Sequence, residues 1–488
     1  MSSHPLEPIF HPRGTALVGV PSDPNGPGGS GGFLTSIMEQ GYHERFGLYP
    51  VNPKATEIAG LKCYPTLLDI DAPVDHVISL VPARVVPTLV EQAIQKGIRS
   101  IHFFTAGFSE TGDAEMAQME RTMVKRLTDA GIRVIGPNCM GLYVPGVGLA
   151  FMGGFPKEPG NVMLVSQSGA NAGDVVHNLS RRGARFSKVI SFGNGSDLRA
   201  HHFLDYAISD EQTEVVTAYI EGVQDGRKFF EAVKRLAAVK PTILLKGGLT
   251  GAGARAAHSH TGSLAGSTQV FDAMCRQTGA FRAETMEDLH DLTIAVTTGL
   301  KRVKGRDVAL VGGGGGFAVL SSDSLAREGL DLPPAPQELK DALHEFMPVA
   351  GTSANNPFDT NMSTPELSER ALRIVARGPF DVVIATPSFD RPQRGPDDEP
   401  LDTEAKRKHA LEAAEKAAEQ FGRLQAETGV PFIALMRDRG ASPEVADRFA
   451  QEAYRRGVAV YPTIHRAARA VAGLLEWRER RAGLPDII

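Results

Sequence analysis

The sequence predicts an α/β protein in which several parallel sheets follow one another along the chain. Short apolar runs, such as residues 15–20 and 76–81, alternate with stretches of helical length, such as residues 86–96. This alternation is typical of βαβ units, whose neighbouring strands are parallel. The 52 glycines and 32 prolines among 488 residues supply the tight turns that such units need.

The alternation divides into three blocks, and we expect one domain from each. In the first block, residues 1–145, the expected strands are 15–20, 46–51, 76–81, 100–104 and 133–135, and the expected helices are 33–40, 86–96 and 113–130. In the second block, residues 146–302, the expected strands are 161–166, 187–192, 215–220 and 241–246. In the third block, residues 303–488, they are 307–311, 380–386, 431–436 and 458–461.

The composition argues against several classes of protein. A net charge of −5 gives no electrostatic reason to expect nucleic-acid or membrane binding. The three cysteines form no CxxC pair, which argues against a disulfide framework or a structural zinc site and fits a reduced cytoplasm. We expect neither a signal peptide nor a membrane span. His201 and His202 suggest a metal, but adjacent side chains on a helix face different directions, so we expect no metal site.

The segment Ser259–Ser267 is the strongest candidate for chemistry. It sets His260 among small and hydroxyl-bearing residues, so that the backbone can approach an anion closely. A helix is expected at residues 268–277, with Ser267 as its cap and Gly279 at its end. An imidazole in such a loop is well placed to carry a phosphoryl group.

A glycine-rich loop at residues 19–32 follows the first expected strand. Glycines at a strand-to-helix junction expose backbone amides to phosphate, although the spacing is neither GxGxxG nor a P-loop. A ligand that contains a nucleotide and a plain connecting loop are equally compatible with it. Lys54, after the next strand, could meet a phosphate there or be solvated.

Two features of the second block could hold an anion. Ser166 and Ser168 stand at another strand–turn–helix junction, which is either an anion site or an ordinary helix cap. Glu221 follows a strand, at the edge of a parallel sheet where ligands gather. A carboxylate beside His260 would fix the tautomer of the ring and favour its charged form. A solvated loop glutamate is the alternative.

These motifs, taken in order along nearly the whole chain, resemble the NDP-forming acyl-CoA synthetase superfamily. The α subunit of ADP-forming acetate–CoA ligase is most similar, and succinyl-CoA synthetase α is more distant. The resemblance is carried by Val51–Lys54, Ala106–Glu110, Gly136–Gly141, Ser166–Gly169, Gly193–Asn194 with Asp197, Tyr219–Gly222, Ser259–Ser263 and Asn356–Asp359. It implies a Rossmann-like CoA-binding domain (1–145), a ligase domain with a phosphohistidine loop (146–302) and a second flavodoxin-like ligase domain (303–488).

The resemblance also implies roles for particular residues. His260 would be phosphorylated transiently, with Glu221 orienting it. Phosphate and the acyl group would contact Ser166, Gln167, Ser168, Gly169, Asn194, Thr261, Gly262 and Ser263. Coenzyme A would contact Gly19, Ser22, Gly28, Lys54, Val81, Pro82, Ala106, Gly107 and Asn138. The implied reaction converts acyl-CoA, phosphate and ADP into carboxylic acid, CoA and ATP through an acyl phosphate.

Three departures from the family pattern bear on this interpretation. We find no ATP-grasp segment, so ADP or ATP with Mg²⁺ is expected on a separate β subunit. The loop at residues 21–32 is longer and richer in glycine and proline than usual. The third block contains five consecutive glycines, 312–316, and a charged insertion near residues 391–408. The alternative function is that of a CoA-binding regulatory protein without turnover. A third hypothesis, a nicotinamide-dependent dehydrogenase, is based only on the Rossmann-like pattern of the first domain.

Overall fold

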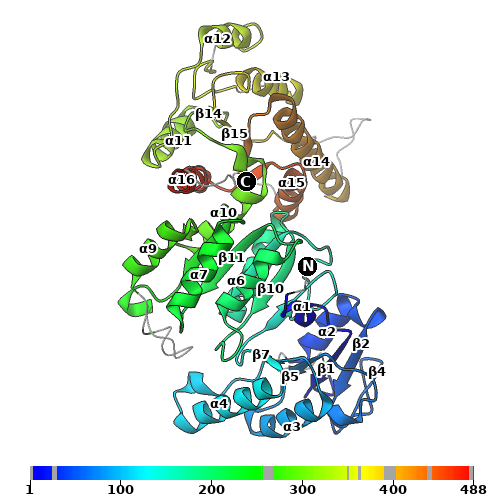
Figure 1. Cartoon of the computed structure of the whole chain (residues 1–488). Coiled ribbons are helices and arrows are strands. Elements are labelled where there is room, and N and C mark those ends of the chain that lie inside the picture. Colours follow the sequence, from blue (N-terminus) through cyan, green and yellow to red (C-terminus); the bar gives the residue numbers. More distant parts are fainter. Residues whose placement is uncertain are drawn as a thin grey trace. The chain divides into compact units, whose positions relative to one another are not determined.

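The computed structural model describes residues 4–24, 30–253, 255, 267–348, 351–360, 364–388, 403–436, 442–482 and 487. The chain is an α/β protein with parallel sheets, which confirms the predicted class (Figure 1). It divides into two compact units, residues 1–177 with 185–284 and residues 178–184 with 285–486. The predicted domain bounds at residues 145 and 302 stay a prediction.

The first sheet of the first unit has the strand order β2-β1-β5-β6-β7, all parallel. Its strands are β1 (Gly14–Val18), β2 (Gly47–Val51), β5 (His76–Ser79), β6 (Ser100–Phe103) and β7 (Arg133–Ile135). The associated elements are α1 (Glu7–Phe10), α2 (Gly32–Glu39), α3 (Val86–Lys96), α4 (Ala114–Asp129) and the short strands β3 (Glu57–Ile58) and β4 (Leu61–Lys62). Helices α3 and α4 lie on one side of the sheet and α2 on the other (Figure 1). The strand order therefore reverses between β1 and β5.

The second sheet of the first unit has the order β13-β12-β11-β9-β10-β8, and only β8 is antiparallel. Its strands are β8 (Gly141–Tyr143), β9 (Val162–Ser166), β10 (Phe186–Ser191), β11 (Val215–Ile220), β12 (Thr242–Lys246) and β13 (Phe281–Ala283). Its helices are α5 (Gly169–Arg181), α6 (Ala200–Ser209), α7 (Gly226–Ala237) and α9 (Thr268–Thr278). Helices α6, α7 and α9 lie in a row over one face (Figure 1). Helix α9 begins and ends as the sequence predicts, capped by Ser267 and closed by Gly279 in a left-handed conformation.

The loop after β10 joins the two sheets of the first unit. Its backbone N–H groups at Asn194, Ser196 and Leu198 donate to carbonyl oxygens of residues 137, 136 and 134 over 3.0, 3.2 and 3.2 Å. The carboxylate of Asp197 accepts two hydrogen bonds from the Arg133 guanidinium, over 2.9 and 2.8 Å. The carboxyl ends of the two sheets are therefore held beside one loop.

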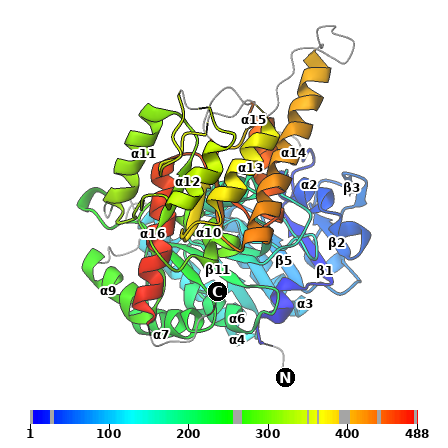
Figure 2. The same ribbon diagram turned by 90° about the horizontal axis from the view of Figure 1, so that it is seen from above.

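The second unit contains a parallel sheet of order β14-β15-β16-β17. Its strands are β14 (Val308–Val311), β15 (Val382–Ala385), β16 (Phe432–Leu435) and β17 (Ala459–Tyr461). Its helices are α10 (Met286–Thr297), α11 (Gly315–Arg327), α12 (Gln337–His344), α13 (Pro365–Val375), α14 (Thr403–Thr428), α15 (Pro443–Arg455) and α16 (Ile464–Arg480). Helices α13, α14 and α15 pack side by side in both views (Figures 1 and 2). The buried carboxylate of Asp291 pairs with Arg182 and Arg466 over 2.7 and 2.6 Å.

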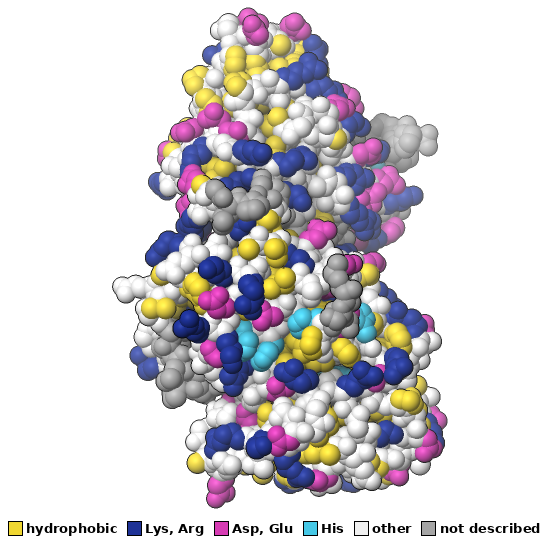
Figure 3. Space-filling view, viewed as in Figure 1, with side chains coloured by type: hydrophobic (Ala, Val, Ile, Leu, Met, Phe, Trp, Pro, Cys, Tyr) yellow, Lys and Arg dark blue, Asp and Glu magenta, His cyan; other side chains and the backbone are white. Residues whose placement is uncertain are grey.

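Acidic and basic side chains are interspersed on the face drawn in Figure 3. None of the helices in the described part of the chain combines the length and apolar character that a bilayer span requires.

Candidate functional site

The residues predicted to contact CoA gather at the carboxyl edge of the first sheet. Gly19 follows β1, Lys54 follows β2, Val81 and Pro82 follow β5, Ala106 and Gly107 follow β6, and Asn138 follows β7. The point where the strand order reverses, between β1 and β5, is where ligands bind in such sheets. Ser22 and Lys54 are exposed there, and Gly28 lies outside the described residues.

Close backbone approaches shape this edge. Gly19 has a φ of 95°, and a Cβ atom there would lie 2.8 Å from Cγ1 of Val81, so only glycine fits. Thr105 donates its hydroxyl to the carbonyl oxygen of Val81 over 2.8 Å, and Glu110 accepts the N–H of Gly107 over 2.5 Å. The loops after β1, β5 and β6 therefore form one compact surface.

The second sheet gathers a further set of predicted residues at its own carboxyl edge. Ser166, Gln167, Ser168 and Gly169 join β9 to α5, Asn194 follows β10, and Glu221 follows β11. The hydroxyl of Ser166 is buried, donating to the carbonyl oxygen of Ser168 over 2.7 Å and accepting its N–H over 3.2 Å. This hydroxyl thus shapes the turn, and its predicted contact with phosphate stays a prediction.

Side chains from both neighbouring strands hold the turn that carries Glu221. The side-chain oxygen of Gln167 accepts the N–H groups of Glu221 and Gly222 over 2.8 and 3.0 Å. From the other side, the Lys246 ammonium donates to the carbonyl oxygens of Glu221 and, over 2.6 Å, Gly247. The peptide groups on both sides of Glu221 are therefore fixed.

The electrostatics of this turn reflect its burial. Lys246 and Glu221 are 6% and 7% exposed. Burial lowers the pKa of Lys246, and the charge of Glu221 opposes that shift. The hydroxyl of Tyr219 forms hydrogen bonds with Glu221 and Asn171, and burial, together with the nearby carboxylate, raises the pKa of Tyr219 to about 12. Sequence reasoning missed Lys246; a lysine that closes the apolar strand Thr242–Lys246 was the available signal.

Asn194 connects this edge to the first sheet. Its side-chain nitrogen donates to Glu110 Oε2 over 2.7 Å and to Ser109 Oγ and Glu120 Oε2 over 3.3 Å each. Ser196 also donates to Glu120. The amide nitrogen predicted to meet phosphate or the acyl group thus has carboxylate partners, and its predicted role stays a prediction.

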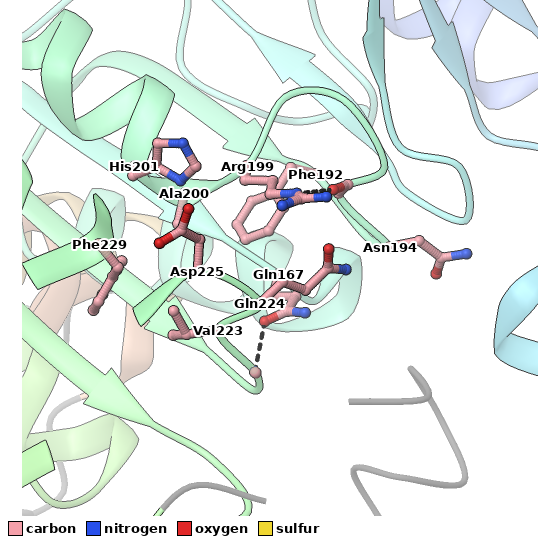
Figure 4. A pocket seen from close by; sticks show the side chains of 12 residues that line it. Gln167, Phe192, Asn194, Arg199, Ala200, His201, Val223, Gln224, Asp225 and Phe229 are labelled. Carbon is pink, nitrogen blue, oxygen red and sulfur yellow. Dashed lines mark hydrogen bonds between the residues drawn. The ribbon is translucent and has the colours of Figure 1, made fainter. Parts of the chain in front are cut away.

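A pocket opens between the loops after β10 and β11 and the starts of α6 and α7 (Figure 4). Its cavity volume is about 20 Å³, so the pocket is a narrow hollow. Gln167 and Asn194 line it together with Phe192, Arg199 and Phe229. It therefore borders the Glu221 turn directly, and sequence reasoning missed its aromatic and guanidinium side chains.

The remaining predicted site residues, His260, Thr261, Gly262 and Ser263, lie outside the described residues. The predicted pairing of His260 with Glu221 therefore stays a prediction.

Over the described part of the chain, no group of three or more His, Cys, Asp and Glu side chains is arranged to hold a metal ion.

Two family models match the first unit and the start of the second. The model described as "CoA binding domain" matches residues 13–145. The model described as "Succinyl-CoA ligase like flavodoxin domain" matches residues 159–296. Each match contains one of the two carboxyl edges described above.

Two relatives differ in their length relative to this chain. The α subunit of ADP-forming acetate–CoA ligase I from Pyrococcus furiosus is 31% identical over 483 residues, which are 98% of each chain. ADP-forming acetate–CoA ligase I from Archaeoglobus fulgidus is 36% identical over 382 residues, 78% of this chain and 54% of that protein. The chain thus spans about half the length of this single-chain relative.

A solved structure matches the chain over nearly all of its residues. It is the dinucleotide-forming acetyl-coenzyme A synthetase 1 of Ca. Korarchaeum cryptofilum in complex with phosphate and ADP. The two share 29% sequence identity and a TM-score of 0.77, over 98% of this chain and 97% of the other.

Proposed function

Because this chain belongs to the family of ADP-forming acetate–CoA ligase α subunits, we propose that it is the α-type subunit of an NDP-forming acid–CoA ligase. It interconverts acyl-CoA, phosphate and ADP with a carboxylic acid, CoA and ATP. ADP is the proposed nucleotide, and the α subunit contributes the CoA site and the phosphorylated histidine.

The proposal rests on one observation within the first unit. The loop that carries Asn194 lies between the carboxyl edge of the first sheet, where the proposed CoA site is, and the turn that carries Glu221. Asn194 bonds to Glu110 and Glu120, beside Gly107 of the proposed CoA site. The loop that carries Asn194 also lines the pocket beside Gln167. A thioester bound at the first edge would therefore have its reacting end near the second edge.

The proposed chemistry is a relay of covalent steps. Phosphate attacks the thioester carbonyl, the C–S bond breaks, and CoA leaves as a thiol after protonation, with an acyl phosphate formed. One ring nitrogen of His260 then attacks phosphorus, the bond between phosphorus and the acyl oxygen breaks, and the carboxylate leaves. An ADP phosphate oxygen takes the phosphoryl group, which regenerates His260 and yields ATP.

The described residues have supporting roles in this relay. Glu221 accepts a hydrogen bond from the second ring nitrogen of His260, fixes its tautomer and balances its charge. Gln167 and Lys246 hold the backbone of Glu221 in place. The turn from Ser166 to Gly169 and the loop residues Thr261, Gly262 and Ser263 hold the phosphate, with backbone amides and hydroxyls as donors.

The proposed partner is a β subunit of the ATP-grasp type that binds ADP or ATP with Mg²⁺, in a cytoplasmic hetero-oligomer. Two findings support a partner outside this chain: one relative is named an α subunit, and a single-chain relative is about twice as long as the matched region. Co-purification of the tagged chain with such a subunit, and ATP formation only when both are present, would support the assembly.

The experiment is a label transfer that needs no nucleotide. The chain is incubated with [³²P]phosphate and acetyl-CoA, and acid-labile, base-stable label is expected on the protein. His260→Ala abolishes the label, whereas His258→Ala, two residues earlier in the same segment, serves as the matched control and keeps it. Label that survives His260→Ala contradicts the proposal. CoA binding without label, with or without an ATP-grasp partner, favours the regulatory alternative.

A further inference from the structure

We propose that Lys246 is a positioning residue of the proposed reaction, which fixes the distance between Glu221 and the stretch of chain that includes His260. Its ammonium binds one carbonyl oxygen in the turn that carries Glu221 and another at the start of the chain that leads to His260. The inference rests on the proposed function, which pairs these two residues. Lys246 acts through its hold on the two turns and touches no reacting atom.

The two turns that Lys246 joins follow neighbouring strands. Lys246 is the last residue of β12 and lies opposite Ile220, the last residue of β11, in a parallel pairing. The N–H of Gly247 donates to the carbonyl oxygen of Ile220 over 2.8 Å. The chain therefore leaves both strands at the same level of the sheet, with Glu221 after one strand and Gly247 after the other.

The Lys246 ammonium lies between two carbonyl oxygens. It donates to that of Glu221 and, over 2.6 Å, to that of Gly247, and only 6% of Lys246 is exposed. Carbonyl oxygens that converge on one point repel each other, and away from water they need a donor between them. An ammonium has three donors and can bind both oxygens at once. Without it, we expect the two turns to separate.

The turn after β12 has little freedom to adjust. Gly247 has no room for a side chain, because a Cβ atom there would lie 2.8 Å from the hydroxyl oxygen of Tyr219. Gly248 has a φ of 72°, which turns the chain away from the strand at once. The carbonyl oxygen of Gly247 therefore lies on a closely packed turn, and its bond to Lys246 fixes that turn against the one after β11.

The stretch of chain that includes His260 begins and ends at one place. The carbonyl oxygen of Leu249 accepts the hydroxyl of Thr268, the first residue of α9, over 3.2 Å. Leu249 follows Lys246 by only three positions along the chain. The ammonium therefore anchors the base of this stretch as well as the turn of Glu221.

Gln167 holds the Glu221 turn from the other side and differs from Lys246 in its reach. Its side-chain oxygen accepts the N–H groups of Glu221 and Gly222, and Figure 4 shows the bond to Gly222. In the described part of the chain, its side-chain hydrogen bonds reach this turn only, whereas those of Lys246 reach both turns. Loss of Lys246 thus changes how Glu221 lies relative to His260, and misplacement of reacting groups is costly in rate.

The test measures the rate at which His260 is labelled from [³²P]phosphate at several acetyl-CoA concentrations. Lys246→Met keeps the length of the side chain without its donors, and the maximal rate is expected to fall by about 10- to 100-fold. The acetyl-CoA concentration at half-maximal rate is expected to stay within about twofold, because the proposed CoA site lies at the other sheet. Lys246→Arg keeps a charged donor and is expected to recover most of the rate.

Lys240 provides a matched control in the same sheet. Its ammonium also donates to two backbone carbonyl oxygens, those of Ala207 and Asp210, over 2.6 and 2.7 Å. It precedes β12 and so lies at the end of the sheet away from Glu221. Lys240→Met removes the same kind of contact, and the labelling rate is expected to stay within about twofold of the parent rate.

A double-mutant cycle with Glu221→Gln separates positioning from a general loss of structure. Since Lys246 acts through Glu221, Lys246→Met is expected to slow labelling by no more than about threefold in the Glu221→Gln background. Lys246→Gln, which keeps a shorter donor, enters the same cycle if the methionine variant fails to fold. Losses that multiply in the double variant would overturn the inference. A parent-like maximal rate in Lys246→Met, or an equal loss in Lys240→Met, would do the same.

The proposed function is judged separately, by the parent protein. Absence of label on His260 in the parent contradicts the relay and this inference with it. Label in the parent at a rate that does not depend on Lys246 supports the relay and contradicts only the positioning role.

Discussion

The side-chain oxygen of Gln167 lies 2.8 Å from the backbone nitrogen of Glu221 and accepts its hydrogen bond. The two residues come from neighbouring strands, β9 and β11, whose paired residues Ser166 and Tyr219 immediately precede the site. Gln167, which follows β9, therefore fixes the backbone of Glu221, the proposed hydrogen-bond partner of His260.

Removing this amide is expected to destabilise the first unit. In Gln167→Ala, the N–H groups of Glu221 and Gly222 lose their acceptor, which lowers the free energy of unfolding by about 1–3 kcal/mol. Urea denaturation measures the change. Gln118→Ala, on the exposed face of α4, is the control and stays within about 0.5 kcal/mol of the parent. Equal stability of the two variants would contradict the fixed turn.

Neutralising Glu221 is expected to slow the labelling of His260 while the protein still folds. Glu221→Gln keeps the shape of the side chain and removes its charge, so labelling of His260 slows by about 100-fold or more. The rate of ³²P incorporation from phosphate and acetyl-CoA is the measurement. Glu211→Gln makes the same exchange at an exposed position of the same unit and keeps the parent rate. A parent-like rate in Glu221→Gln would remove this residue from the mechanism.

Two buried histidines of the first sheet predict sensitivity to acid. Burial, aided by the neighbouring His102, lowers the pKa of His76 to about 3, and burial lowers that of His102 to about 4. Above pH 6.5 neither the folded nor the unfolded state binds these protons. As pH falls below 6.5, the unfolded state takes them up first, so stability falls until the folded pKa values are reached.

At pH 5 the loss amounts to about 2 kcal/mol for each histidine. Urea denaturation at pH 7 and pH 5 measures it. His102→Gln is expected to reduce the difference between the two pH values, whereas Gln118→Ala, on the exposed face of α4, leaves it unchanged. A parent-like pH difference in His102→Gln would show that this ring titrates in the folded protein as in the unfolded one.

The free energy of unfolding of the first unit is expected to depend on a buried ion pair in its second sheet. Lys188 and Asp210 are 2.8 Å apart, and their side chains are 2% and 8% exposed. Lys188→Met leaves the carboxylate buried without its partner and costs about 3–5 kcal/mol.

A surface pair of the same residue types provides the control. Lys125 and Asp129 lie 2.6 Å apart, but their side chains are 73% and 62% exposed. Lys125→Met is therefore expected to change the free energy of unfolding by less than about 1 kcal/mol. Similar losses in Lys188→Met and Lys125→Met would show that burial does not decide the cost.

The sequence predicted the strands well, because a buried parallel strand needs an apolar run bounded by turns. The apolar segment ending at Ser166 and the one ending at Lys246 both became strands with nearly the expected bounds. The three-residue strands β8 and β13 escaped prediction, whereas β7 and β17, which are equally short, were predicted. The pairing of β8 and β13 is decided by β10 and β12, which lie far away along the chain.

The candidate site was predictable in position but less so in its contacts. Glu221 and Gln167 follow strands, and parallel strands bring their carboxyl ends to one edge. The orientation of the Gln167 amide depends on N–H groups of another strand, and the partners of Asn194 come from another sheet. Arg199 and Phe229 gave no local signal, since only the folded chain brings α6 and α7 to one pocket.

The loop that ties Asn194 and Ser196 to Glu110 and Glu120 sets a limit on how the chain can be recombined with its relatives. A chimera joined near residue 145 would set carboxylates from one parent against an amide and a hydroxyl from another. It would also separate β8 from β10, the strand with which it pairs. Exchanging residues 1–284 as a block keeps these partners together, so a chimera joined beyond residue 284 leaves the contacts of this loop intact.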